Sequence, residues 1–164
     1  MGSQRRSLDI GRAAQTDHAG ARFTDIVLEV FRLNGALIAA GNALADGTGL
    51  TSARWQVLGA VALAGASPTV AQIARSMGLT RQGVQRLVDE LEADGMVRRV
   101  SHPESRRARA VQLTPRGESL YAEMMRRQAP WANRTAKGID PATLQRAFDV
   151  LRELRVRLER DAGE

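Results

Sequence analysis

The sequence has no cysteine and only two histidines, and these shortages exclude several kinds of site. Without cysteine the chain can form no disulfide, no thiolate metal site and no thiol redox sensor. The two histidines, His18 and His102, are far apart in the sequence and have no metal-ligand spacing to a neighbour. We therefore expect no metal site and no cofactor, and we expect both histidines at the surface.

Long hydrophobic runs are also missing. The longest run, VLGAVALAGA from Val57 to Ala66, is about half as long as a membrane-spanning helix and contains two glycines. Residues 1–20 include basic side chains but no apolar stretch of the kind that a secretory signal needs. These features predict a cytoplasmic protein with no membrane partner and with a flexible N-terminal arm over residues 1–20.

Catalytic groups are equally scarce. The sequence has no histidine cluster, no glycine-rich phosphate loop and no carboxylate pair placed for a cleft. The only acidic cluster, DELEAD from Asp89 to Asp94, would point in several directions on a helix. We name no catalytic residue and expect that the protein is not an enzyme.

The charge of the chain is basic. Lysine and arginine outnumber aspartate and glutamate by 24 to 18, which gives a net charge of +6, and Lys137 is the only lysine. This excess favours a polyanionic partner only weakly, because an arginine bias can also follow from the coding composition of a genome. A chain of 164 residues has room for one ordinary domain with helical additions.

Hydrophobic spacing predicts a mainly α fold with one small β-hairpin. The first helix runs from Ala21 to about Asp46, and Pro130 is expected to kink or end the fifth helix near Gln128. Two strands, Met96–Val100 and Ala108–Leu113, are joined by the polar loop SHPESRR. The residues that we expect to cap the later helices or to lie in their first turn are Thr51, Thr69, Thr80, Pro115 and Asp140.

The fourth helix, which begins after Thr80, has two chemically different faces. At about 100° per residue, Val84 and Leu91 share an apolar side with their neighbours, and the opposite side is rich in glutamine and arginine. Glutamine pairs with adenine and arginine with guanine in the major groove, and helix N-termini attract phosphates. The alternative is a solvated face without a function. Our DNA-binding candidates on this helix are Thr80, Arg81, Gln82, Gln85 and Arg86.

The hairpin gives a second argument for DNA. The segment from Arg98 to Arg116 contains six arginines and one glutamate, so the excess charge of the chain is concentrated there. Arg106 and Arg107, near the tip, can reach phosphates or enter a narrow minor groove. The alternative is a solvated basic loop. We add Arg106 and Arg107 to the DNA-binding candidates.

The segment from Thr69 to Arg99 carries the pattern of a helix-turn-helix. The residues that fit this pattern are Ala74, Gly78, Leu79, Val84 and Leu87. Together with the motif HPESRRARAVQLTPRG and two C-terminal helices, it makes the chain resemble transcriptional regulators of the MarR (multiple antibiotic resistance regulator) family. The resemblance is sharpest from Leu50 to Gly117. It implies a winged helix-turn-helix with N- and C-terminal dimerisation helices.

This resemblance also implies a division of the chain and a function. Residues 21–49 would form a dimerisation helix, residues 50–117 the DNA-binding domain, and residues 118–164 two further dimerisation helices. The protein would be a homodimeric repressor that binds double-stranded DNA at a pseudo-palindromic operator. The family has an aspartate two residues before its minor-groove arginine. Here Ser105 precedes Arg107 and cannot form a salt bridge, so we expect a looser hold on that arginine.

Members of this family commonly bind small aromatic or amphipathic anions between the dimerisation helices and the winged domain. By that resemblance, Arg22, Phe31 and Trp55 are our candidates for a ligand site, although ordinary packing or a solvated charge also explains each of them. The competing function is a winged-helix module that binds another protein and not DNA. Such a module has no need for six arginines around the hairpin, and its affinity would respond weakly to salt.

Overall fold

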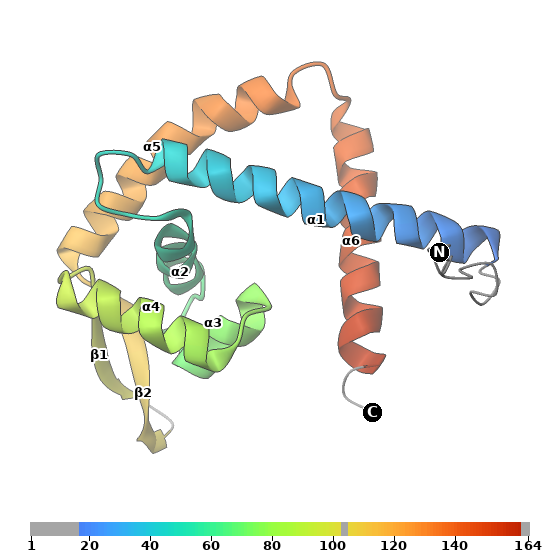
Figure 1. The fold of residues 1–164 in the computed structure, drawn as a ribbon. Helices are drawn as coiled ribbons and strands as arrows, with labels where there is room; N and C mark the ends of the chain where they lie inside the picture. The colour runs from blue at the N-terminus through green and yellow to red at the C-terminus, as the bar shows by residue number, and fades with distance from the viewer. Residues whose placement is uncertain (1–16, 103–104, 162–164) are drawn as a thin grey trace, which may run out of the picture.

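The computed structural model describes residues 17–102 and 105–161, and for residues 102 and 105–107 it describes the backbone alone. Within these ranges the chain forms six helices and one hairpin, which confirms the mainly α fold class. The elements are α1 (His18–Leu44), α2 (Ser52–Ala62), α3 (Val70–Met77), α4 (Arg81–Ala93), β1 (Val97–His102), β2 (Ser105–Leu113), α5 (Pro115–Ala136) and α6 (Pro141–Asp161). Figure 1 shows α2, α3, α4 and the hairpin in one cluster, with α6 apart from it.

Short polar side chains set where the helices begin. Thr69 and Gln72 form a reciprocal capping box at the start of α3, and the hydroxyl of Thr80 accepts a hydrogen bond from the amide of Gly83 in α4. Between these two helices Gly78 has a φ of +64°, a left-handed conformation that costs glycine little. The predicted caps Thr69 and Thr80 are therefore confirmed, and the turn between α3 and α4 is tight.

The core lies in the cluster around α2, which contacts α1, α3, α4, α5 and β2. Its fully buried side chains are almost all aliphatic, and each contributes about 1.5 to 3 kcal/mol by leaving water. The largest of them are Leu58, Ile73, Leu91, Met124, Val57, Val84, Val88, Val97 and Val111. This core packs α4 and the hairpin against each other.

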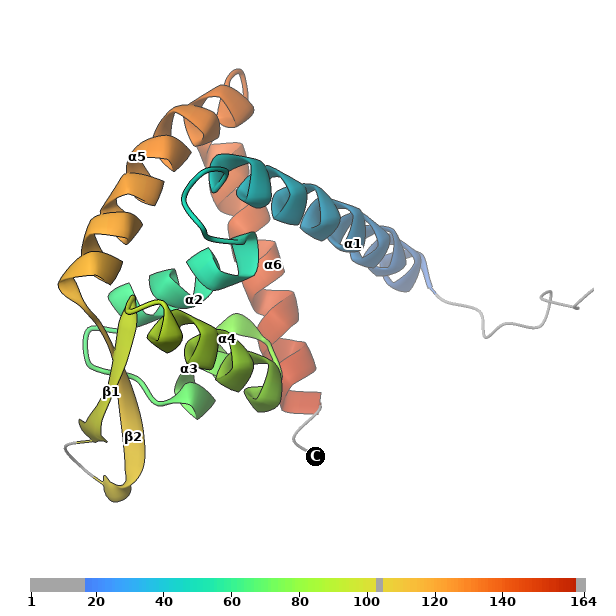
Figure 2. The ribbon, with the colours of Figure 1, turned by 60° about the vertical axis from the view of Figure 1, so that its left-hand side comes forward.

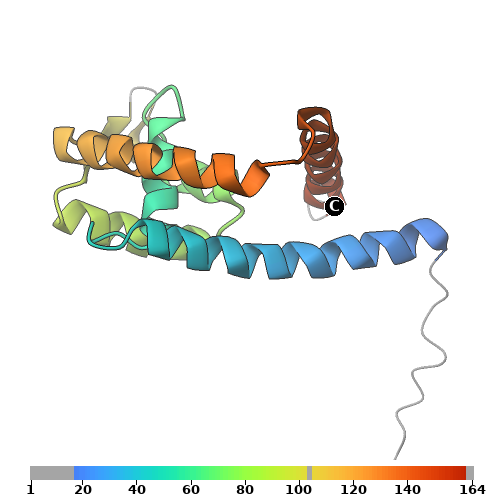
Figure 3. The same ribbon diagram turned by 90° about the horizontal axis from the view of Figure 1, so that it is seen from above.

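The remaining helices bury much less. Viewed from above in Figure 3, α1 and α5 run along each other on the two sides of α2, and α6 stands past the end of α5, while α1 extends further still. Arg127 of α5 donates hydrogen bonds to the carbonyls of Leu44 and Asp46 at the end of α1. No residue of α6 is buried, and Phe148 of α6 and Phe31 of α1 are 57% and 69% exposed.

Three boundaries differ from the sequence prediction. The arm predicted for residues 1–20 lies outside the described residues up to residue 16, but α1 begins at His18 and not at Ala21. The reason is Asp17, whose carboxylate accepts a hydrogen bond from the amide of Gly20 and caps the helix.

The second difference is in the hairpin. β1 extends to His102 and β2 starts at Ser105, so the long loop predicted over SHPESRR is wrong. Backbone pairing continues through these polar residues, with Ser101 opposite Arg109 and His102 opposite Ser105 across one irregularity in register. Pairing satisfies the backbone groups regardless of side-chain polarity, which a search for apolar strands does not detect.

The third difference is in α5, which continues through Pro130 to Ala136, so of the two expected effects of Pro130, a kink or an end near Gln128, the end is wrong. Proline removes one backbone donor from the helix. Pro130 is exposed, whereas Gln128 and Trp131 beside it are half-buried and keep the helix in place.

Candidate nucleic-acid interface

One side of α4 faces the core and the other carries the polar candidates. Val84, Val88 and Leu91 are buried, whereas Arg81, Gln82 and Arg86 are exposed and Gln85 is half-buried. The exposed side is hollowed into a shallow depression. Its lining residues are Thr80, Gln82, Gly83, Gln85, Arg86 and Asp89. The structure therefore brings four of the five α4 candidates into one depression, and Arg81 lies beside it in the first turn.

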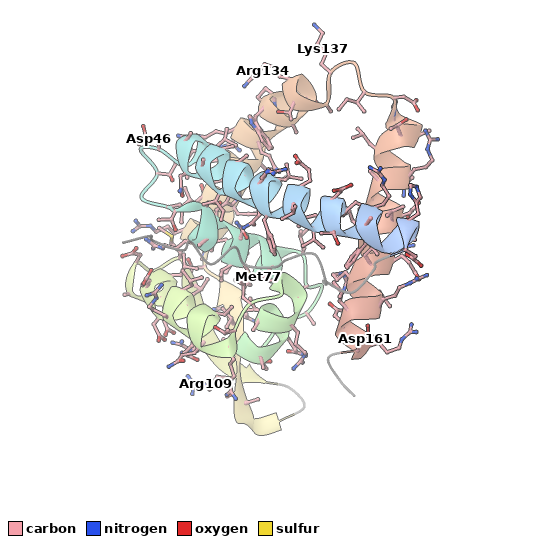
Figure 4. All side chains as sticks on the ribbon, turned by 45° about the vertical axis from the view of Figure 1, so that its right-hand side comes forward. Asp46, Met77, Arg109, Arg134, Lys137 and Asp161 are labelled. Carbon is pink, nitrogen blue, oxygen red and sulfur yellow. The ribbon has the colours of Figure 1, made fainter. Side chains whose placement is uncertain are left out.

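The hairpin lies next to this helix. In Figures 1 and 2 it extends past α4 on the side away from α1, as a wing beside a recognition helix does. Arg109, which Figure 4 labels, is exposed on β2, and Arg98 is exposed on β1 with its guanidinium 3.1 Å from the amide oxygen of Gln112. Ser105, Arg106 and Arg107 belong to β2, but their side chains lie outside the described part of the chain.

Arg86 is available for a ligand. Its side chain is 79% exposed, and its Nε lies 3.8 Å from Glu90, one turn further along α4. An exposed ion pair of this length contributes little, about 0 to 1 kcal/mol. Glu90 therefore does not prevent Arg86 from reaching a base or a phosphate.

Gln85, in contrast, is held in place. Its Nε2 donates a hydrogen bond to Oδ1 of Asp89 over 2.9 Å, and the same carboxylate oxygen accepts from the guanidinium of Arg99 on β1. The bond from Arg99 lowers the pKa of Asp89 below its ordinary 3.8, and the bond from Gln85 lowers it further. Arg99 also pairs with Glu92, which in turn accepts from the Arg99 amide over 3.0 Å.

Sequence reasoning missed this network. The sequence places Asp89 on the polar face of the fourth helix and in an acidic cluster, and Arg99 among the six hairpin arginines, but it gives no bond between them. The four-residue spacing of Gln85 and Asp89 was a readable signal, because side chains at i and i+4 are neighbours on a helix. The contribution of Arg99 crosses from a strand to a helix, so spacing alone does not reveal it.

The ligand candidates do not come together. A cavity of about 420 Å³ lies between α1, α2 and α5, and Trp55 lines it. Arg22 and Phe31 are not part of its lining; Arg22 instead pairs with Asp25 over 3.2 Å on the exposed surface of α1. The lining comprises Leu37, Gly41, Leu44, Ser52, Trp55, Gln56, Gly59, Leu63, Tyr121, Met125, Gln128 and Trp131.

This cavity is aromatic and uncharged. Trp55, Tyr121 and Trp131 provide ring surface, Gln56 and Gln128 provide amides, and no lining residue carries a charge. The sequence analysis did not include the α5 residues, because their approach to α2 depends on the tertiary fold. Among the described residues no helix is both long and apolar enough to cross a membrane, and no three acidic or histidine side chains gather as a metal site would need.

Comparison with known proteins agrees with this geometry. A model of the MarR family matches residues 48–108, which include α2, α3, α4 and most of the hairpin. An uncharacterized protein of Mycobacterium tuberculosis is 37% identical over 134 residues, which cover 82% of this chain and 92% of the relative.

Solved structures extend the match to nearly the whole fold. The transcriptional regulator PA3341 is 33% identical, with a TM-score of 0.73, over 84% of this chain and 98% of that protein. CouR from Rhodococcus jostii RHA1, solved bound to p-coumaroyl-CoA, is 28% identical with a TM-score of 0.73 over 79% of this chain and 91% of that chain.

Proposed function

The chain belongs to the MarR family of winged helix-turn-helix transcriptional regulators, which implies DNA binding by a homodimer, and we propose that it is a repressor of this kind. The observation that carries the proposal is the exposed polar face of α4 beside an arginine-rich hairpin. In this proposal residues 50–117 bind DNA, and residues 21–49 and 118–164 hold the two copies together. Bound at a promoter, the dimer blocks polymerase.

Each candidate has a role on the DNA. α4 enters the major groove, where Gln85 contacts adenine and Arg86 contacts guanine. The start of α4, with Thr80, Arg81 and Gln82, lies against phosphates. Arg106 and Arg107 of the wing approach the adjacent minor groove or its phosphates. Two-fold symmetry then requires a pseudo-palindromic operator with half-site centres about 34 Å apart.

Exposed apolar side chains support the pairing of two copies through α1 and α6. A single chain leaves these groups in water, and a second copy can cover them. In α1 they are Leu28, Val30, Phe31, Leu33, Leu37 and Ile38, and in α6 they are Leu144, Phe148, Val150, Leu151, Val156 and Leu158.

The cavity between α1, α2 and α5 is our proposed ligand site, and its occupation would release the operator. CouR, a relative with the same fold, was solved with p-coumaroyl-CoA bound. In this chain the lining offers rings and amides but no cation, so we propose that it holds the aromatic part of a ligand. A typical coupling of about 1 to 3 kcal/mol between ligand and DNA would weaken operator binding by roughly 5- to 150-fold.

The test begins with selection of bound duplexes from a random DNA pool by the purified protein. We expect an inverted repeat, and an affinity for it whose logarithm falls with log salt by about 0.9 per phosphate neutralised. If no sequence is enriched and binding is weak at physiological salt, the protein-interaction function replaces this proposal.

Single substitutions then assign the roles. We expect Gln85→Ala and Arg86→Ala to change which base is preferred, and Arg107→Ala to weaken binding to all duplexes alike. Arg134→Ala is the matched control: it also removes one exposed arginine, but at the end of α5 remote from the hairpin (Figure 4). Unchanged base preference in both α4 variants would refute the assignment of α4 as the recognition helix.

A further inference from the structure

We propose that Asp89 and Arg99 are positioning residues that orient the side-chain amide of Gln85 and thereby give the protein its preference for adenine at one position of each half-site. This proposal rests on the proposed function of α4 as the recognition helix. It adds two residues that do not contact DNA themselves. The geometry behind it is the chain of bonds from Gln85 to Asp89 to Arg99.

The first step is the direction of the Gln85 amide. A glutamine amide has a donor end and an acceptor end, and it can turn over to exchange them. An ionised carboxylate only accepts hydrogen bonds, so the 2.9 Å contact with Asp89 requires the Nε2 end of Gln85 on that side. The amide therefore has one orientation, with Oε1 and one N–H free.

The second step is what this orientation fits. Adenine presents an N6 donor and an N7 acceptor in the major groove. The free Oε1 and the remaining N–H of Gln85 match that pair. Guanine presents two acceptors, O6 and N7, and would place an oxygen opposite the Oε1 of Gln85. Turning the amide over would let Nε2 donate to O6 but would place Oε1 opposite N7, so guanine could gain at most one hydrogen bond, and the turn would break the bond to Asp89.

The third step is how Asp89 itself is held. The Asp89 side chain is 54% exposed and would move freely on an isolated helix, whereas the Arg99 side chain is only 19% exposed. Arg99 is fixed from two directions, because Glu92 accepts from its guanidinium and from its backbone amide. The root of the wing thus fixes Asp89, and Asp89 fixes Gln85.

The experiment measures binding by fluorescence anisotropy to four duplexes that differ only at the operator base pair whose preference Gln85→Ala abolishes. We expect the wild-type protein to favour adenine by about tenfold or more, the lower part of the range for a bidentate contact. In Asp89→Ala the affinity for the adenine duplex should exceed that for the other duplexes by no more than about threefold. Non-specific duplexes should bind this variant at least as well as they bind the wild type.

The matched control is Asp89→Asn. It removes the same charge near the DNA but keeps an oxygen that accepts from Gln85, so it should retain more of the adenine preference than Asp89→Ala. Equal ratios in the two variants, or a full adenine preference in Asp89→Ala, overturn the proposal. Arg99→Ala tests the second link and should also lower the ratio. If a folded Arg99→Ala variant keeps the full adenine preference, Arg99 is not a positioning residue.

Failure of the recognition-helix function has a different signature. In that case no operator base pair loses its preference in Gln85→Ala, and the four-duplex comparison has no position to use. The two Asp89 variants should fold, because the Asp89 side chain lies outside the core. Circular dichroism of each variant checks this before the titrations.

Discussion

Gly117 lies where the wing meets α5, and Gly117→Ala should be strongly destabilising. A Cβ at this residue would lie 2.0 Å from the carbonyl oxygen of Met96 and 3.0 Å from its carbonyl carbon. Real Cβ contacts are essentially never shorter than 3.0 Å, so the start of α5 must move away from Met96 by about 1 Å. Both clashing atoms belong to the backbone, which a side-chain rotation cannot relieve.

The displacement also breaks bonds. The same Met96 oxygen accepts from the amide and from the hydroxyl of Thr114, at 3.1 and 3.2 Å. Overpacking a tight site costs about 1 to 3 kcal/mol, and each lost hydrogen bond costs about 1 kcal/mol more. The slightly better helix propensity of alanine offsets less than about 1 kcal/mol of this. We expect a net loss of about 2 to 4 kcal/mol in the free energy of unfolding.

The assay is urea unfolding followed by far-ultraviolet circular dichroism, at one fixed chain concentration because unfolding of a homodimer depends on it. Gly35→Ala in α1 is the matched control. A Cβ there meets nothing within 4 Å, so the same substitution should stabilise the protein by about 0.5 to 1 kcal/mol. Equal unfolding midpoints for the two variants would show that the close contact between α5 and Met96 does not exist in solution.

Three further predictions concern other contacts. Arg127→Ala should lower the unfolding free energy by about 1 to 3 kcal/mol, because two carbonyls at the end of α1 lose a charged donor. The control Arg126→Ala, which changes the exposed neighbouring residue, should be nearly neutral in the same urea assay. Similar losses in both variants would contradict the role of Arg127 in holding the end of α1. Thr69→Ala removes the capping box of α3 and should cost about 0.5 to 2 kcal/mol, against no more than a few tenths for the exposed Thr135→Ala. Asp89 has a folded pKa below its ordinary 3.8, so its ionised form stabilises the fold above that value and the contribution is lost as the pH falls through the folded pKa. The stability difference between wild type and Asp89→Asn, measured by urea unfolding from pH 7 to pH 3, should therefore shrink toward the acid end, and a difference that persists unchanged excludes this origin.

What the sequence could predict was mainly local. Thr69, Gly78 and Thr80 act on residues within one helical turn, so their effect is visible in a short stretch of sequence. That α5 continues past Pro130 could not be predicted locally, because it depends on which side of the helix faces solvent. The hairpin loop was predicted too long because the strands were sought by their apolar residues, whereas backbone pairing also joins polar residues such as Ser101 and Arg109.

In the candidate site, too, local features could be predicted and contacts between distant segments could not. The α4 candidates follow from the helical period, and four of them line one depression. The bond between Arg99 and Asp89, in contrast, connects a strand to a helix, and the cavity wall combines Trp55 with Tyr121 from a distant helix. Arg22, by contrast, lies outside that lining and pairs with Asp25 on the exposed surface of α1.

The absence of buried residues in α6 has a consequence for gene dosage. In the dimer that we propose, α6 gains its packing from the second chain, so stability and assembly cannot be separated from protein concentration. While most chains are single, the amount of dimer rises with the square of the chain concentration, and halving synthesis removes about three quarters of it. A promoter controlled by this protein would then respond to its level more steeply than in simple proportion.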